Sequence, residues 1–123
     1  MLFRSLPKAV ARYVARLVAA SHATAAEAPA KVRQYVRYGA SPRAAIGIAE
    51  AARAAALLDR RPTVGFEDVR LVTAAVLNHR LVLNYQARYD QVTSSMLVDD
   101  LLAAVPEVAM DLPEDVNVGG GER

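Results

Sequence analysis

The stretch Tyr38-Gly39-Ala40-Ser41-Pro42-Arg43-Ala44 decides the fold, because it has the pattern of a helix start around which the other segments are arranged. Ser41 suits the N-cap, where its hydroxyl can accept a hydrogen bond from an N–H group of the first turn. Pro42 then falls at the first helical position, where its missing N–H costs nothing and its fixed φ suits a helix. Gly39 lets the chain turn into this cap without a Cβ clash.

Arg43 is the unusual residue of this stretch. A cation in the first helical turn faces the positive end of the helix dipole, which costs about 0.3–1 kcal/mol. Either the Arg43 side chain points into solvent and this cost is tolerated, or it meets an anion, because a helix N-terminus already favours anions. The local sequence leaves both interpretations open.

The helix that follows is predicted over residues 42–59 and is apolar on nearly all sides, so we expect it to be central and buried. Its many alanines allow close approach by neighbouring helices. Glu50 and Arg53 interrupt the apolar surface, and their i, i+3 spacing suits an ion pair. Arg43 is thus one of very few charges on this helix.

A second helix is predicted before this one, over residues 5–21, with Ser5 as a candidate N-cap and Pro7 in the first turn. Its apolar residues recur at helical spacing and form one buried stripe: Leu6, Val10, Tyr13, Val14, Leu17 and Val18.

Two more helices are predicted after the helix over residues 42–59. One starts at Gly65 as N-cap, carries Glu67 and Asp68 in its first turn, and has an apolar stripe of Phe66, Val69, Val72 and Val76, with His79 as a capping or packing residue. The last starts at the N-cap Thr93 and ends before Pro106, with a core face of Met96, Leu97, Leu101, Leu102 and Val105.

Three segments between these helices have weaker patterns. Residues 21–31 are small and polar and indicate a surface loop with room for one helical turn. Residues 32–38 fit a short strand or an extended lead into the Gly39 turn, and residues 81–92 fit either a helix continuation or a short strand. We therefore predict an all-α domain of about four helices over residues 1–111, with or without a minor pair of short strands. Residues 112–123 are predicted to be a flexible, acidic and Gly-rich tail.

Charge is distributed unevenly along the chain. Residues 1–80 carry 13 basic and 5 acidic side chains, whereas residues 81–123 carry 2 basic and 8 acidic ones. Arginines and a lysine recur every four residues near the start, which indicates a solvated face or a docking surface for an acidic partner or nucleic acid: Arg4, Lys8, Arg12 and Arg16. A small basic module that binds nucleic acid, with Arg33 and Arg37 added to this set, is the less favoured alternative function, as is a purely structural interaction module.

Several classes of protein are disfavoured by what the sequence lacks. It has no cysteine, no apolar run long enough for a membrane span and no convincing signal peptide, which fits a cytoplasmic protein. It has no Gly-Lys-Ser/Thr phosphate loop and no acidic strand end of the Walker B type, so we expect no catalysis by this chain alone. His22 has neither cysteine nor a carboxylate pair near it, so no metal site is expected.

Taken together, these segments resemble the C-terminal lid subdomain of MoxR-type AAA+ ATPases over roughly residues 8–106. The resemblance is carried by Val36 through Ala44, by Ala51-Ala52-Arg53-Ala54, and by Arg61, Val64 and Glu67-Asp68-Val69. It continues through residues 76–81 (Val-Leu-Asn-His-Arg-Leu), Thr93 and residues 101–106.

The resemblance implies an all-α lid that packs on an N-terminal nucleotide-binding core outside this chain. It implies that Arg43 is the sensor-2 arginine, which reaches the γ-phosphate of ATP, and that Ser41, Pro42 and Ala44 lie beside the nucleotide. Magnesium would be held by the core. Family members form homo-hexameric rings that act as chaperone-like remodelling ATPases, often with partners that contain a von Willebrand factor A domain; a membrane span is not expected and nucleic-acid binding is not favoured.

The chain departs from the family pattern at five positions. Arg60 stands where the family usually has glycine, which changes the helix C-cap. Gly65 and Phe66 replace the usual Ser or Thr and the frequent Pro, so we expect a weaker cap there. Ser21-His22 replaces a frequent Thr-Arg, so a basic contact of the family is not expected there.

Overall fold

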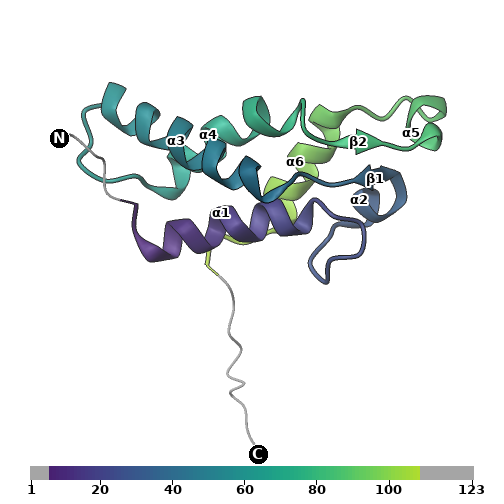
Figure 1. The fold of residues 1–123 in the computed structure, drawn as a ribbon, viewed down its shortest axis with the longest axis horizontal. Coiled ribbons are helices and arrows are strands. Elements are labelled where there is room, and N and C mark those ends of the chain that lie inside the picture. Colours follow the sequence, from purple (N-terminus) through teal and green to yellow (C-terminus); the bar gives the residue numbers. More distant parts are fainter. Residues whose placement is uncertain (1–5, 109–123) are drawn as a thin grey trace, which may run out of the picture.

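Six helices and one pair of short strands form residues 6–108, the part of the chain that the computed structural model describes. Figure 1 shows them in the order α1 (Lys8–Ala20), α2 (Ala30–Tyr35), β1 (Val36–Tyr38), α3 (Pro42–Leu58), α4 (Phe66–Leu77), β2 (Val82–Leu83), α5 (Tyr85–Tyr89) and α6 (Ser94–Ala104). The predicted all-α class is confirmed, and the two short helices α2 and α5 raise the helix number above the expected four. The expected boundary at residue 111 and the tail after it lie outside the described residues, as does Ser5.

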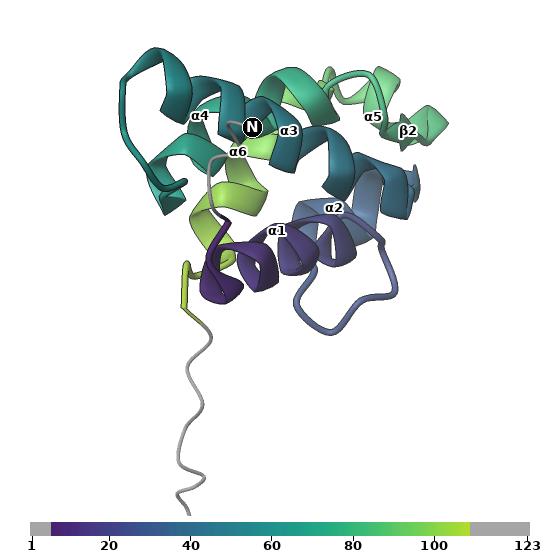
Figure 2. The same ribbon diagram turned by 60° about the vertical axis from the view of Figure 1, so that its left-hand side comes forward.

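Helix α3 lies between α1 and α4, and α4 also packs on α6 (Figures 1 and 2). Residues of α3 spaced four apart are fully buried: Ala44, Ile48, Ala52 and Ala56. Small side chains in this stripe let the neighbouring helix backbones come close.

The prediction that this helix is buried on nearly all sides is wrong. Ile46, Leu57 and Leu58 are 60%, 47% and 85% exposed, because α1 and α4 cover only the stripe described above. No ion pair joins Glu50 to Arg53 in the described part of the chain, so that expected interaction is absent as well.

The other long helices bury the predicted faces with small differences. In α1 the whole stripe from Val10 to Val18 is buried, and Leu6 packs against it. His79 follows the end of α4 and is exposed rather than packed. In α6 Thr93 is the N-cap, accepting a hydrogen bond from Met96 N–H (3.3 Å), but Met96 is 40% exposed and Val98 takes its predicted place in the core.

Residues 32–38, predicted to be a short strand or an extended lead into the Gly39 turn, are helical up to Tyr35 and extended only from Val36 to Tyr38. Helix α2 starts after Pro29 and buries Val32 and Tyr35, whose i, i+3 spacing suits one helix face. The Arg33 guanidinium also donates to carbonyl oxygens of the preceding loop, including those of Ala25 (2.9 Å) and Ala26 (3.1 Å). Side-chain anchoring and core packing therefore override the alternating pattern, and only β1 is extended.

Residues 81–92 contain both a strand and a helix. Strand β2 pairs with β1 in antiparallel fashion, so the optional strand pair exists. Asn84 joins the two parts: its side-chain amide donates to Gln34 O (2.7 Å), while its side-chain oxygen caps α5 by accepting from Ala87 N–H (3.0 Å). One asparagine thus ends the strand and starts the helix.

Candidate functional site

The start of α3 has the predicted cap arrangement with one difference. Ser41 is the N-cap with extended backbone, and Pro42 occupies the first helical position. The Ser41 hydroxyl makes no capping hydrogen bond, however, because the Ala44 N–H donates to the Ser41 carbonyl oxygen instead (2.9 Å). The backbone of the cap residue therefore satisfies a donor that its side chain was expected to satisfy.

The four predicted site residues lie together in this first turn. Ser41, Pro42 and Arg43 are exposed, whereas Ala44 is fully buried and fixes the turn to the core. Within residues 6–108 the Arg43 guanidinium has no ion-pair partner. Its charge is thus available to an anionic group from outside the described part of the chain.

Two residues of the loop after α1 hold the backbone that leads into this turn. The buried Ser21 hydroxyl donates to Val18 O (2.6 Å) and accepts from Ala40 N–H (2.9 Å). The His22 side chain, through Nε2, lies 2.8 Å from Ala40 O, so Nε2 carries the proton and donates. Both polar groups of the Ala40 peptide are thereby fixed to the end of α1.

Gly39 is needed at this point for a different reason from the one predicted. A Cβ atom there would lie 2.7 Å from Ser21 O and 2.8 Å from the His22 ring, which is closer than real contacts allow. The glycine therefore permits the close approach of the Ser21-His22 loop rather than the turn into the cap. The sequence therefore marked Gly39 correctly as a special position, but the group that approaches it is a loop distant in sequence.

A shallow apolar hollow of about 380 Å³ lies beside the Arg43 turn. It is lined by side chains from the end of α1 and the start of α3, among them Val18, Ala19, His22, Pro42 and Ala45. An apolar hollow next to a cation at a helix N-terminus suits a ligand with a flat apolar part and an anionic part. The lining is apolar apart from the His22 ring, whose Nε2 is already bonded to Ala40 O.

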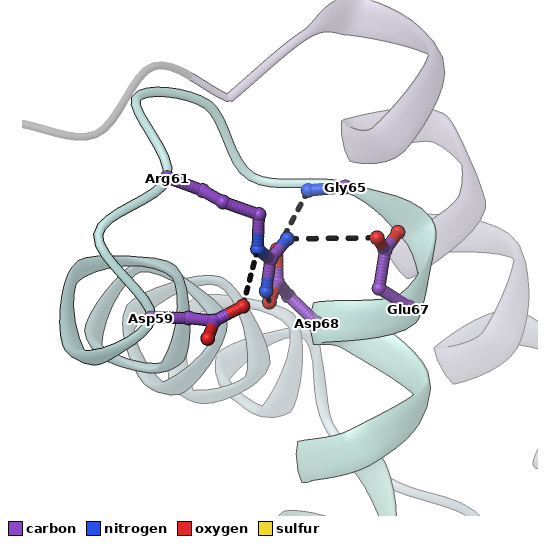
Figure 3. Close-up of polar contacts among 5 residues, drawn as sticks. All are labelled: Asp59, Arg61, Gly65, Glu67 and Asp68. Carbon is purple, nitrogen blue, oxygen red and sulfur yellow. Dashed lines mark hydrogen bonds and ion pairs between the residues drawn. The ribbon is translucent and has the colours of Figure 1, made fainter.

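A second polar cluster closes the opposite end of α3, as Figure 3 shows. Arg61 in the α3–α4 loop makes a bidentate ion pair with the buried Asp68 carboxylate, and Asp68 also accepts from Gly65 N–H (2.8 Å). Asp59 receives a further Arg61 hydrogen bond (2.8 Å), and Glu67 lies at 3.6 Å. This arrangement ties the loop to both helices.

Charge in this cluster is strongly stabilised. Burial alone would raise the pKa of the Asp68 carboxyl, but the hydrogen bonds from Arg61 and Gly65 outweigh burial and hold its pKa below the usual value. The pKa of Arg61 is raised, chiefly by its hydrogen bonds to Asp68 and Asp59. Asp68 thus remains a carboxylate in the interior, and the first-turn role predicted for it was only part of its function.

Sequence reasoning missed the roles of Ser21, His22 and Asp68 in fixing the two ends of α3. For Ser21 and His22 the sequence offered one indication, a short polar pair directly after an apolar helix, and no motif surrounds that pair. Two arginines from the basic sets considered for nucleic acid have partners in the fold: Arg16 donates to Pro106 O (2.9 Å) and Arg33 to loop carbonyls.

Two properties of the described residues bear on other classes of site. No group of three potential metal ligands occurs among residues 6–108. None of the helices formed there is both long and apolar enough to cross a membrane.

This chain is similar to one protein family and to two bacterial proteins. The family model of the AAA lid domain matches residues 28–101. The chain is 39% identical over 102 residues to chaperone MoxR1 of Mycobacterium tuberculosis, which covers 81% of this chain and 27% of that protein. It is 34% identical over 77 residues to the uncharacterised protein YeaC of Bacillus subtilis, covering 61% of this chain and 24% of YeaC.

A solved structure has the same fold. The crystal structure of a provisionally assigned ATPase from Cytophaga hutchinsonii superimposes with a TM-score of 0.80 at 31% identity. The match covers 84% of this chain and 31% of that one. This chain therefore spans about a quarter to a third of the length of the relatives it matches.

Proposed function

Because this chain belongs to the AAA lid domain family and is homologous to a MoxR chaperone, we propose that it is the lid of a MoxR-type AAA+ ATPase and supplies Arg43 to the γ-phosphate of ATP. The nucleotide and its magnesium would be held mainly by a core domain outside this chain. Ser41 and Pro42 would line the lid side of the nucleotide site, with the buried Ala44 directly behind them.

The observation that carries this proposal is the position of Arg43. Its guanidinium is exposed, lacks an ion-pair partner within residues 6–108, and stands at the N-terminus of a 17-residue helix. An arginine placed against the helix dipole is unfavourable alone, but it becomes favourable once an anion neutralises both. The adjacent hollow at Pro42 offers an apolar surface that a nucleobase or ribose could contact.

The chemistry expected of Arg43 is electrostatic. Bound ATP would supply a phosphoryl group whose transfer develops charge on its equatorial oxygens. A guanidinium that contacts those oxygens stabilises that charge without itself gaining or losing a proton. Ser21 and His22 would keep the Arg43 turn in place, since they fix the Ala40 peptide directly before it.

The test is Arg43→Ala in the full-length parent ATPase. We expect the turnover of ATP to fall about 10-fold or more, which corresponds to at least about 1.4 kcal/mol of transition-state stabilisation. Arg53→Ala is the matched control, because Arg53 is on the same helix and also has no ion pair with the described residues, and it should leave turnover within about twofold. Unchanged turnover in Arg43→Ala, with native helix content by circular dichroism, would overturn the assigned role.

Family membership also supports finer proposals about the whole parent protein. We propose a homo-hexameric ring in the cytoplasm that remodels other proteins with the help of a partner containing a von Willebrand factor A domain. Mass photometry of the full-length parent with ATP should then give six times the subunit mass. A monomer under those conditions would contradict the ring.

A further inference from the structure

The hollow beside the Arg43 turn has a single polar side chain among the described residues that line it, the imidazole of His22. The rest of the lining consists of Val18, Pro42 and alanines from the end of α1 and the start of α3, two segments that pack together (Figure 1). Its volume of about 380 Å³ falls within the range of small-molecule pockets. His22 is therefore the side chain that can recognise a ligand there by hydrogen bonding.

Two contacts fix the orientation of the His22 ring. Its Nε2 atom donates to Ala40 O at 2.8 Å, and its Cγ atom is the ring atom that a Cβ on Gly39 would meet, also at 2.8 Å. Because Cδ2 is bonded to both Cγ and Nε2, this edge of the ring faces the Gly39-Ala40 backbone. The opposite edge, which holds Nδ1 and Cε1, is consequently turned away from that backbone.

The Nδ1 atom of His22 is an acceptor without a donor. A neutral imidazole carries one proton, so the proton on Nε2 leaves a lone pair on Nδ1. Within residues 6–108 the His22 side chain makes one hydrogen bond, the one from Nε2 to Ala40 O, and His22 is exposed. A ligand in the hollow can therefore donate a hydrogen bond to Nδ1.

The chemistry of the hollow favours one part of ATP, if ATP binds beside Arg43 as proposed above. The apolar lining suits a flat ring, whereas a ribose would leave most of its hydroxyl groups without partners. Among the purines, adenine carries an exocyclic amino group, which is a donor, where guanine carries an acceptor oxygen. Only adenine thus offers at this position the group that Nδ1 can accept from.

We propose that His22 recognises the base of the bound nucleotide, with Nδ1 accepting a hydrogen bond from the exocyclic amino group of adenine in the hollow. Guanine would place two acceptors against each other and is disfavoured. His22 is then a specificity-determining residue that also fixes the Ala40 peptide before the Arg43 turn. This inference rests on the proposed nucleotide site, but it can fail while the role of Arg43 stands.

The test compares two substrates of the full-length parent ATPase, ATP and purine riboside triphosphate, which lacks the exocyclic amino group. The preference for ATP, taken as the ratio of the two kcat/KM values, should fall about 2- to 10-fold in His22→Ala, the range for one neutral hydrogen bond. Loss of the bond to Ala40 O lowers both values in this variant, but a uniform loss cancels in the ratio. His22→Asn keeps an acceptor near the position of Nδ1 and should keep the preference.

Arg43→Ala is the matched control, because loss of a phosphate contact should slow both substrates alike and leave the preference unchanged. An equal preference for ATP in the native protein and in His22→Ala would overturn the role of His22 while leaving that of Arg43 intact. A preference lost equally in His22→Asn and His22→Ala would show that the acceptor is not its cause. Unchanged turnover in Arg43→Ala removes the role of Arg43 alone, and a parent that hydrolyses neither nucleotide would overturn both proposals.

Discussion

At the scale of single residues, the fold depends on a few buried polar groups whose partners are distant in sequence. Asp68 is almost fully buried and is stable there only because Arg61 and Gly65 supply hydrogen bonds. Ser21 is equally buried and bridges α1 to the Ala40 peptide. Such groups stabilise a structure only when all their partners are present, since an unpaired buried group costs far more than an exposed one.

Replacement of Asp68 by asparagine should destabilise the chain by about 1–3 kcal/mol in urea unfolding, towards the lower end because Arg61 is partly exposed. Glu67→Gln is the matched control: Glu67 is exposed and more distant from Arg61, so we expect less than about 0.5 kcal/mol. Because the folded-state pKa of Asp68 lies below the value of 3.8 usual for the unfolded state, its stabilisation is complete above that pH and is lost as the pH falls below it. The Asn variant should lack this acid-dependent part, and equal acid sensitivity in both proteins would contradict the assignment.

Ser21→Ala should cost about 1–2 kcal/mol, because it leaves the buried Ala40 N–H without a partner. Hydrogen exchange at the Ala40 amide should accelerate in this variant. Ser21→Thr keeps the hydroxyl and should restore slow exchange at that amide. If Ala and Thr variants exchange alike, the hydroxyl is not what fixes the Arg43 turn to α1.

At the scale of elements, α3 and α5 both end with a residue in the left-handed conformation, and in neither helix is that residue glycine. After α3 the Arg61 N–H donates to Ala56 O (2.9 Å) and Arg60 N–H to Leu57 O (3.0 Å), with Arg60 at φ 58°. This pair of bonds is a Schellman motif, whose left-handed residue is usually glycine. Gln91, at φ 61°, has the same place after α5.

Arg60→Gly should therefore raise the free energy of unfolding by about 0.5–1 kcal/mol, because relief of the left-handed strain exceeds the entropy that glycine adds to the unfolded chain. Thermal unfolding of the 123-residue chain measures this directly. Arg60→Ala keeps the strain and removes only the charge, so it should not stabilise. An Ala variant as stable as the Gly variant would mean that charge, and not backbone strain, is the cause.

The long helices could be predicted from the sequence because their apolar spacing and caps are local signals. Ser41-Pro42, Thr93 and the stripe of α1 each placed an element correctly. The short elements could not be predicted, since α2 depends on Arg33 contacts with a loop and α5 depends on Asn84 bridging to Gln34. Burial of α3 was overestimated because composition shows that a face is apolar but not whether the chain contains a neighbour to cover it.

The same distinction applies to the candidate site. The position of Arg43 at a helix start followed from local sequence, and its proposed role followed from family resemblance. The Ser21 and His22 contacts with Ala40 join residues 18 or 19 positions apart, and no local pattern encodes them.

At the scale of the whole molecule, the proposed function gives this chain one side of a nucleotide site whose other side a core domain would supply. One guanidinium and a helix end should not hold a nucleotide, so we expect the isolated chain to bind ATP with a Kd above about 1 mM, weaker than about −4.1 kcal/mol. Isothermal titration calorimetry with Mg·ATP tests this on the chain as it stands. A micromolar Kd would show that the lid has a complete site of its own.

Helix α3 extends from Arg43 in its first turn to the Arg61–Asp68 cluster beyond its last, and its 17 residues span about 25 Å. Both ends are fixed, one through Ala40 to the end of α1 and the other to α4, and the buried stripe between them leaves α3 no room to tilt alone. A force applied at Arg43 would therefore be carried by α1, α3 and α4 together, and the exposed Leu57 and Leu58 at the far end would move with them as one unit.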